Sequence, residues 1–451
     1  MMDPVPATSP PRPGAVPWRW RAVARALVAM VGVGALVGLG ADRGAAVGPP
    51  AGARVVVVAG TGRPGSRVGS ATGTPLDGPT GVAVGANGDL FIADTGNCRV
   101  VEVPGAFGQS AGPTGRARLR VVAGDGCGRP GGPAGARATG TGIGSAQGVA
   151  VDAAGDLFIA TTSDNRVLEV PATTTTRLGT TMVAGHLYTV VGTGAPGAAG
   201  GGGSGALDAP QGLAVDPAGD LFIADTGYCR VREVPLRSGV QFGVPVVAGR
   251  PTTVAGSGSC GTIAGASVAT GDGGPAVDAV LWTPTALTLD GAGDLIIADR
   301  GNDSVREVAA TSGTYYGVPI GAGDIGTVAG SGSGYGPYLV DGLSATGPTA
   351  GLNFVSGVAV DGQGNLFVAD LYDRAVREVA GTGGRSFGRP VTADDLYTLV
   401  GSVPTGPTQD QTRWVVTRVT YPSGVAVAPS GAVVFSDRGA NVVRAVVAPG
   451  S

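Results

Sequence analysis

Short runs of strand-forming residues alternate with turns rich in Gly, Asp and Asn over most of the chain. In one clear example, the runs Leu213–Val215, Leu221–Ala224 and Arg230–Val234 are separated by turns at 216–219 and 225–228. Runs rich in Val, Ile, Leu and Phe and bounded by turn residues are typical of consecutive antiparallel strands. The Asp that opens each turn can accept hydrogen bonds from backbone amides, and the Gly can adopt a positive φ. The pattern therefore predicts strands joined by tight turns.

This three-strand pattern recurs along the chain, which predicts a repeat architecture. The copies begin at Gly81, Gly148, Gly212, Ala286, Gly357 and Gly424. After a variable loop, all but the last copy are followed by a fourth apolar run, at Val121–Ala123, Tyr188–Val191, Thr252–Ala255, Ile325–Ala329 and Leu396–Val400. A regular period of this kind is typical of solenoids and propellers, and four antiparallel strands per repeat make a propeller blade. We therefore predict an all-β, six-bladed β-propeller of four-stranded antiparallel blades.

The last repeat has no fourth apolar run after its third strand, which ends at Val447. An unassigned run with the same Val-Ala-Gly ending, Arg54–Gly60, lies before the first repeat. If this N-terminal strand pairs with the last blade, the ring closes and no sheet edge stays open. We therefore predict that the N-terminal strand closes a propeller spanning residues 50–451.

The repeated phrase also resembles a known family. The third copy reads GLAVDPAGDLFIADTGYCRVREVP from Gly212, and the general form P-x-G-[VL]-A-V-D-x-x-G-[DN]-L-F-[IV]-A-D-x-x-N-x-R-V is similar to the NHL repeat. The loop Thr270–Ala276 resembles the one that precedes this repeat in many bacterial members. The resemblance implies the propeller fold strongly. It implies function only weakly, because NHL propellers serve in RNA binding, extracellular sensing, adhesion and a few enzymes.

Composition and charge argue against a nucleic-acid partner. Charged residues make up 14% of the chain, its net charge is −3, and all of its basic residues other than one His are Arg. No basic stripe with interleaved aromatic residues is visible, and RNA or DNA binding usually requires one. We therefore expect no nucleic acid among the partners.

Residues 1–49 have the features of a secretory signal peptide or signal anchor followed by a Pro/Gly-rich linker. Arg12, Arg19, Arg21 and Arg25 precede an apolar stretch, residues 26–40, and small residues follow it at Ala45 and Ala46. A positive flank, a short apolar core and a small-residue cleavage region are typical of export signals. The stretch is shorter than the roughly 20 residues of a membrane span, although an uncleaved anchor stays open. We expect a monomeric propeller that is secreted or membrane-anchored outside the cell, with an N-terminal segment that engages the export machinery.

The four cysteines predict two local disulfides. Cys98 and Cys229 occupy the same turn in the first and third repeats, while Cys127 and Cys260 follow the fourth strands of those repeats. In an antiparallel blade the start of the third strand lies beside the end of the fourth, which pairs Cys98 with Cys127 and Cys229 with Cys260. A zinc site is disfavoured because two distant blades cannot bring four cysteines together, and disulfides are expected in an exported protein.

The mouth of the central channel is the usual ligand site of a propeller. The residues just before the first strand of each blade are small or neutral and polar, and we take them as candidate ligand-binding residues: Thr80, Gln147, Gln211, Thr285, Ser356 and Ser423. Gluconolactonase-like propellers place carboxylates round a divalent metal here, and amidating-lyase relatives need several His. This ring offers no carboxylate, and the one His of the chain, His186, is expected at a surface or rim.

Other carboxylates recur too regularly to form an asymmetric catalytic site. Aspartates that end the second strand are expected to cap turns: Asp94, Asp225, Asp299, Asp370 and Asp437. Glutamates in the third strand are expected to form cross-strand or interblade ion pairs: Glu102, Glu169, Glu233, Glu307 and Glu378, with Arg232, Arg306 and Arg377 nearby. We expect no cofactor, with Ca²⁺ at the loop Gly271–Gly274 as a weaker alternative.

The sequence therefore predicts a non-catalytic binding or scaffold module at the cell envelope or outside it, with a protein or glycan ligand. The alternative is a propeller enzyme of the lyase or lactonase type with a divalent metal in its channel. The sequence does not identify the ligand.

Overall fold

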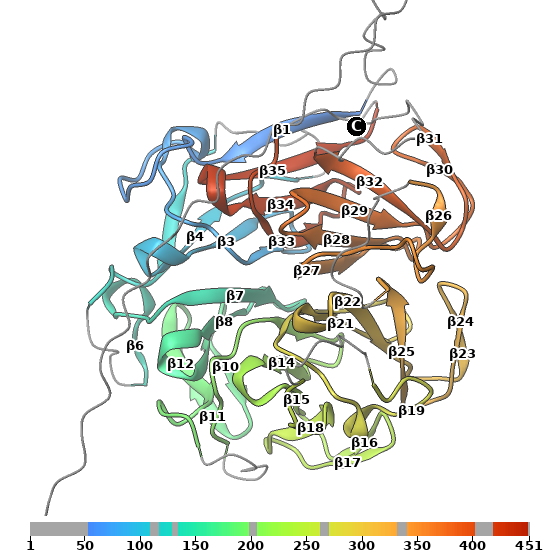
Figure 1. Ribbon diagram of the computed structural model, residues 1–451. Helices are drawn as coiled ribbons and strands as arrows, with labels where there is room; N and C mark the ends of the chain where they lie inside the picture. The colour runs from blue at the N-terminus through green and yellow to red at the C-terminus, as the bar shows by residue number, and fades with distance from the viewer. Residues whose placement is uncertain are drawn as a thin grey trace, which may run out of the picture. The chain divides into compact units, whose positions relative to one another are not determined.

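The computed structural model describes residues 53–108, 117–128, 134–197, 205–261, 270–331, 341–401 and 418–449. Their strands form six antiparallel blades that follow one another round a central axis, from blue to red in Figure 1. The N-terminal residues 1–52, and with them the predicted export signal, lie outside the described ranges. Within those ranges no helix has the length and apolarity that a membrane crossing requires.

In blades 1 to 5 the strands lie in chain order from the channel outward, and in every blade we call the four positions, from the channel outward, a, b, c and d. Blade 1 contains β2 (Val82–Val84), β3 (Leu90–Asp94), β4 (Arg99–Val103) and β5 (Arg120–Ala123). Blade 2 contains β7 (Ala146–Val151), β8 (Leu157–Thr161), β9 (Arg166–Val170) and β12 (His186–Val191). Blade 3 contains β13 (Leu213–Val215), β14 (Leu221–Asp225), β15 (Arg230–Val234) and β18 (Thr252–Ala255).

The remaining blades repeat this order. Blade 4 contains β20 (Pro284–Leu289), β21 (Leu295–Asp299), β22 (Ser304–Val308) and β25 (Asp324–Ala329). Blade 5 contains β27 (Val355–Val360), β28 (Leu366–Asp370), β29 (Ala375–Val379) and β32 (Asp395–Gly401). Blade 6 contains β33 (Pro422–Val427), β34 (Val433–Asp437), β35 (Val442–Val447) and, as its strand d, β1 (Arg54–Ala59).

The core lies between neighbouring blades. All five residues of β14 are buried, and the b strands of the other blades show the same pattern. A strand covered on both faces has no solvent side, so its sequence is a continuous apolar run rather than an alternating one. The Leu-Phe-Ile-Ala phrase of the repeat is the sequence of this buried strand.

The predicted closure is confirmed. β1 pairs antiparallel with β35, with Arg54 opposite Val447 and Val56 opposite Ala445, and the two strands lie side by side in Figure 1. The fourth strands of the other blades also lie where the sequence predicts them, within one or two residues. The ring is therefore closed by strands from opposite ends of the propeller sequence.

In blades 2 to 5 a hairpin lies between strands c and d, where the sequence predicted only a variable loop. The hairpins comprise β10 (Thr175–Arg177) with β11 (Thr180–Met182), β16 (Gly239–Gln241) with β17 (Val244–Val246), β23 (Gly313–Tyr315) with β24 (Val318–Ile320), and β30 (Gly384–Ser386) with β31 (Arg389–Val391). Two-residue hairpin turns with positive φ usually carry Asn-Gly. Here bulky residues precede the Gly, as in Phe242-Gly243 with φ values of 47° and 76°. Packing explains the exception, because the Phe242 ring meets the Phe222 ring of the same blade at 6.2 Å.

Shorter elements were not predicted either. Strands of two residues extend the outer edges of three blades: β6 (Ala136–Arg137), β19 (Gly274–Pro275) and β26 (Leu343–Ser344). Single 3₁₀ turns lie before strand a at η1 (Ala71–Gly73), η3 (Ala138–Gly140) and η6 (Ala276–Asp278). Others lie between strands b and c at η2 (Thr95–Asn97), η4 (Thr162–Asp164), η5 (Thr226–Tyr228), η7 (Arg300–Asn302) and η8 (Arg438–Ala440).

Candidate functional site

The six candidate residues of the channel mouth come together in the structure. Thr80, Gln147, Gln211, Thr285, Ser356 and Ser423 all line one central cavity of about 80 Å³, together with the first residues of each strand a. The spacing of the repeats therefore locates this ring correctly. To bind a ligand, the ring must also have polar atoms that are not already hydrogen-bonded within the protein.

Three of the six side chains are committed to contacts between blades. The hydroxyl of Thr80 donates to the carbonyl of Gln147 at 2.9 Å, and that of Ser356 donates to the carbonyl of Pro422 at 2.9 Å. Thr285 makes the equivalent bond to Val355, at 3.2 Å. Each of these bonds joins one blade to the next.

The other three side chains keep their polar atoms available. Within the described ranges, the side chains of Gln147, Gln211 and Ser423 make no hydrogen bond, and all three are partly exposed. Gln147 lies in blade 2, Gln211 in blade 3 and Ser423 in blade 6. The ring therefore offers two amides and one hydroxyl to a ligand or to water.

Glycine at the start of strand a keeps this ring narrow. A Cβ added to Gly148 would lie 1.8 Å from the carbonyl oxygen of Gln211, and one added to Gly357 would lie 2.3 Å from that of Ser423. Such distances are far below van der Waals contact, so the innermost strands approach too closely for any side chain at these points. The small cavity volume follows from this approach.

The loops around the mouth are tied to one another by side chains from the b–c turns. Residues in the left-handed conformation accept a hydrogen bond from the backbone amide of the next blade: Asn165 from Ala209 at 2.7 Å, Asp303 from Phe354 at 2.7 Å, and Asn441 from Gly78 at 2.8 Å. The residue between the Asn and the Arg of the repeat phrase is therefore explained by a contact between blades. Sequence reasoning did not assign this role.

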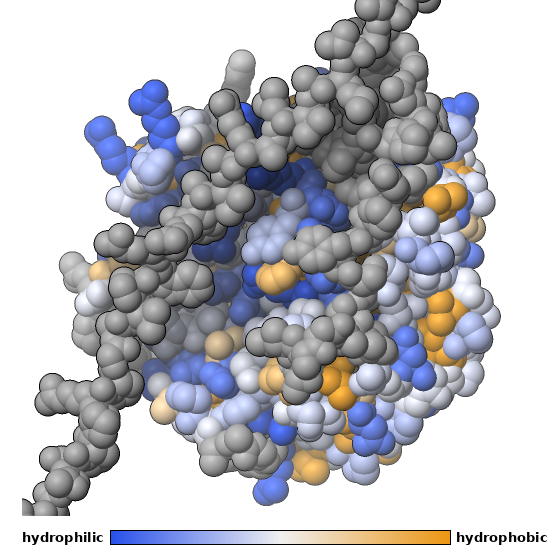
Figure 2. Space-filling view, viewed as in Figure 1, coloured by the Kyte–Doolittle hydropathy of each residue, from blue (hydrophilic) through white to orange (hydrophobic). Residues whose placement is uncertain are grey.

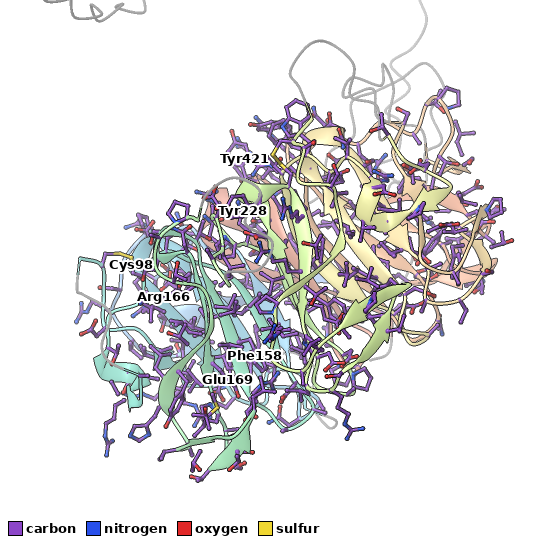
Figure 3. All side chains as sticks on the ribbon, turned by 90° about the horizontal axis from the view of Figure 1, so that it is seen from below. Cys98, Phe158, Arg166, Glu169, Tyr228 and Tyr421 are labelled. Atoms are coloured by element: carbon purple, nitrogen blue, oxygen red, sulfur yellow. A yellow bond between two sulfur atoms is a disulfide. The ribbon has the colours of Figure 1, made fainter. Side chains whose placement is uncertain are left out.

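Cysteines occupy the same left-handed position in blades 1 and 3. Cys98 is bonded to Cys127 and Cys229 to Cys260, with Cα separations of 5.0 and 5.3 Å. Both predicted pairings are confirmed. In Figure 3, Cys98, Arg166, Tyr228 and Tyr421 lie toward one side of the blades and Phe158 and Glu169 toward the other. The disulfides therefore brace the b–c turns on the face that surrounds the channel mouth, which we call the mouth face.

The mouth face is also the side seen in Figure 2, where the middle of the face is hollowed and hydrophilic. Aromatic side chains gather on blades 4 to 6, where Phe354 and Tyr372 meet with ring centroids 4.5 Å apart. Tyr372 is 50% exposed and Tyr421 is 39% exposed. Large exposed aromatic residues are more frequent at binding surfaces than elsewhere.

The repeated aspartates have a structural role, but a different one from the turn capping that we expected. Each accepts a hydrogen bond from the loop that leads into strand a of its own blade: Asp94 from Asp77, Asp225 from Asp208, Asp299 from Trp282, Asp370 from Asn353, and Asp437 from Thr420. The turns between strands a and b do use the predicted cap, as in Asp152, which accepts from the amide of Asp156 at 2.9 Å. The local sequence cannot reveal a partner that lies seventeen residues earlier.

Most of these aspartates also form ion pairs with strand c. Asp225 pairs with Arg232 at 3.0 Å, and Asp94 pairs with Arg99 at 2.7 Å. Burial raises the pKa of Asp225 to about 6 in spite of the arginine. A buried pair of this kind recurs from blade to blade, which indicates a role in the fold rather than in chemistry.

The predicted ion pairs of the strand c glutamates are confirmed only in part. Glu102 pairs with Arg120 at 2.6 Å and Glu169 with Arg177 at 3.5 Å. The prediction is wrong for Glu233 and Glu307, because within the described ranges no basic side chain pairs with either. Burial and the nearby Asp294 and Asp290 raise the pKa of Glu307 to about 8.

The Asp-Gly-rich loop and the histidine lie away from the channel ring. The carboxylate of Asp272 is used in an ion pair with the buried guanidinium of Arg306. His186 is half-buried at the start of β12, opposite Arg137 of β6, and its Nδ1 lies 2.9 Å from the carbonyl oxygen of Ala184. In the part of the chain that the structure describes, no three His, Cys, Asp or Glu side chains gather as a metal site would require.

Two larger hollows lie outside the ring, beside the turns between strands a and b. One, of about 710 Å³, is lined by Phe91, Arg120 and Asp152 of blades 1 and 2 among others. The other, of about 510 Å³, is lined by Arg385, Phe387 and Asp361 among others. They belong to the opposite side of the blades from the mouth face.

Comparison with known proteins supports the resemblance on which the fold was predicted. Residues 76–102 match the NHL repeat. The chain is a six-bladed propeller, and one of its repeats matches the NHL repeat. Among curated proteins, none matches its sequence.

Several solved structures share the fold of this propeller at low sequence identity. A Bacteroides thetaiotaomicron protein of unknown function is 13% identical with a TM-score of 0.54, over 88% of this chain and 76% of its own. An auxiliary nutrient binding protein from Bacteroides ovatus is 12% identical with a TM-score of 0.52, over 88% and 76%. A streptogramin B lyase is 11% identical with a TM-score of 0.43, over 88% and 98%. At these identities the likeness concerns the fold alone.

Proposed function

We propose that this propeller is a non-catalytic binding module that holds a protein or glycan ligand on its mouth face, at the cell envelope or outside the cell. The observation that carries the proposal is the composition of that face. The side-chain amides of Gln147 and Gln211 lie at the channel and make no hydrogen bond to the described residues. Exposed rings of Tyr372 and Tyr421 lie beside the channel, and two disulfides brace the loops. Rigid loops with aromatic anchors and free polar groups favour binding, because little entropy is lost when the ligand arrives.

The proposed location rests on the cysteines and on the sequence of the N-terminus. Both disulfides are formed, and disulfides persist in oxidising compartments. Residues 1–49 carry the predicted export signal. The fold serves nutrient binding in the auxiliary nutrient binding protein of Bacteroides ovatus. We carry over to this chain only the general role of holding a ligand.

The enzyme alternative requires a divalent metal in the channel, and the residues there do not fit one. The ring contributes only hydroxyl and amide side chains. Three of them, those of Gln147, Gln211 and Ser423, make no hydrogen bond within the described ranges. Mg²⁺ and Ca²⁺ prefer several carboxylate oxygens, and Zn²⁺ prefers His and Cys. We therefore derive no catalytic step from this ring.

Binding by the purified full-length protein to an array of envelope and extracellular glycans tests the proposal, with elemental analysis of the same sample. We expect binding to at least one glycan class, lost in Tyr372→Ala combined with Tyr421→Ala. A matched control is Val240→Ala, because Val240 is 69% exposed on the β16–β17 hairpin. Equal binding by the tyrosine variant and the control would contradict the assignment of the mouth face. A stoichiometric, tightly held divalent ion would favour the enzyme instead.

A further inference from the structure

We propose that Arg300 and Arg438 form a carboxylate-binding site at the channel mouth, and that the ligand is a sugar bearing a carboxylate, such as a hexuronate residue of an acidic glycan. The inference rests on the proposed binding function and specifies its ligand class. It is carried by two guanidinium groups that extend toward the same mouth and have no hydrogen bond or ion pair to any residue that the structure describes.

The two arginines occupy one position of the repeat, the first residue of the b–c turn. In blades 1 to 3 this position is Thr, and the hydroxyls of Thr95, Thr162 and Thr226 each donate at 2.7 Å to a carbonyl at the start of the next blade. In blades 4 and 6 the residue is Arg300 and Arg438. In blades 4 and 6 a long cationic side chain therefore replaces the Thr hydroxyl that bonds to the next blade.

The guanidinium of Arg300 is held in place by an aromatic ring, but no carboxylate among the described residues neutralises its charge. Its guanidinium lies over the Phe354 ring of blade 5, with the central carbon 4.7 Å from the ring centroid. Its Nε is buried and has no hydrogen-bond partner. Within the described ranges no carboxylate lies within ion-pair distance of it. Stacking fixes the plane of the guanidinium and leaves its N–H groups available for an acceptor.

Arg438 lies against the equivalent loop of the next blade, where a Gly stands in place of the Phe. A Cβ built on Gly78 of blade 1 would lie 3.8 Å from the Nε of Arg438. Its side chain, too, has no hydrogen bond or ion pair within the described ranges. Arg438 is exposed, so the cost of a buried group without a partner applies to the Nε of Arg300, and a bound anion would recover it.

The two cations act on each other across blade 5. Burial lowers the pKa of the Arg300 guanidinium, the Tyr372 hydroxyl acts in the opposite direction, and the positive charge of Arg438 adds to the lowering. Two like charges within electrostatic range of one another repel unless an anion lies between them. The mouth therefore favours a negatively charged group beside the two arginines.

A planar guanidinium binds a carboxylate through two parallel hydrogen bonds, so the anion that fits best is a carboxylate. Beside the arginines lie the exposed ring of Tyr372 and that of Tyr421, over which Arg374 stacks at 5.8 Å. Gln147 and Gln211 supply free amides. Aromatic faces with amides suit the C–H faces and hydroxyls of a sugar, and a cavity of about 80 Å³ admits a single group rather than a threaded chain.

Calorimetric titration of the full-length protein with a trimer of galacturonic acid tests the proposal. The matched ligand is the same trimer with its carboxyl groups reduced to alcohols. We expect the reduced trimer to bind at least tenfold more weakly, because hydrogen bonds between charged groups are about twice as strong as those between neutral groups. Arg300→Gln and Arg438→Gln should each weaken the acidic trimer about tenfold. Arg250→Gln, an exposed arginine just before β18 on the opposite side of the blades, should leave its affinity unchanged.

Thermal unfolding of each variant shows that the fold is retained, since both arginines project from turns and neither forms an ion pair. Equal affinity for the two trimers, or an equal loss in Arg250→Gln, would overturn the inference. Tighter, arginine-dependent binding of a hexaglutamate peptide would overturn the sugar assignment and point to an acidic protein. If a neutral glycan binds through Tyr372 and Tyr421 while the arginines have no effect, the inference fails and the binding function stands. If no glycan or peptide binds, the proposed function itself fails.

Discussion

Arg54 lies opposite Val447 in a single antiparallel ladder, so the first and last strands of the propeller complete one blade. Deletion of residues 50–60 should therefore open the ring. The deletion removes the buried Val58 and Ala59 and uncovers the edge of β35, at a cost of about 5 kcal/mol from apolar burial alone. We expect a lower melting temperature and concentration-dependent association by light scattering. Deletion of residues 1–49 is the control and should change neither. A monomer of unchanged stability after the first deletion would contradict closure by β1.

The disulfides should be recovered as two local pairs. Non-reducing peptide mapping of protein made in an oxidising compartment is expected to yield Cys98 linked to Cys127 and Cys229 linked to Cys260. Replacing either pair should cost about 3 kcal/mol, because each bridge closes a loop of about 30 residues. A link between Cys98 and Cys229 would contradict the assigned strand order.

The left-handed position of Cys229 allows a sharper test. Its φ is 52°, and in blades 2 and 6 the same position is Asn, whose side chain accepts from the next blade. Cys229→Asn combined with Cys260→Ser should therefore retain about 1 kcal/mol more stability than Cys229→Ala with the same partner change, because Asn tolerates this conformation and can bond the amide of Thr283. Chemical denaturation compares the two. Equal stability would show that the Asn contact does not transfer to blade 3.

The strands and the channel ring could be predicted because the same sequence pattern recurs in every repeat. A buried strand such as Leu221–Asp225 is a continuous apolar run, and Gly212 marks where the innermost strands meet. The c–d hairpins could not be predicted from the sequence. A bulky residue at positive φ in their turns, such as Tyr316, is stabilised by packing that the local sequence does not show. The same limit hid Arg300, because its significance lies in the missing partner and not in its residue type.

Stability should fall as the pH rises from about 4.5 to about 8, and Glu307 should account for part of the change. Burial raises the pKa of Glu307 from 4.5 to about 8. The folded protein therefore keeps a proton that the unfolded chain has already lost, so this contribution is complete below pH 4.5 and is lost as the pH passes through 8. Glu307→Gln should unfold at the same denaturant concentration as the wild type near pH 4.5 and at a higher one near pH 8.5. Glu102→Gln is the control, since Glu102 is paired with Arg120 and should not gain stability at high pH. Parallel pH profiles for Glu307→Gln and the wild type would contradict a buried neutral carboxyl.

Gly148→Ala should disrupt the innermost contact between blades 2 and 3. The added methyl group would lie 1.8 Å from the carbonyl oxygen of Gln211, so the two strands must separate at the point where the channel is narrowest. Overpacking of this kind costs about 1–3 kcal/mol, and here the obstacle is backbone that cannot rotate away. Gly291→Ala is the matched control, because nothing lies within 4 Å of a Cβ built there. Ala286 stands at the equivalent point of blade 4, so the cost depends on local spacing and not on the repeat position. Thermal unfolding should show a lower melting temperature for Gly148→Ala alone. If both variants melt with the wild type, the close approach that makes the channel ring narrow does not exist in solution.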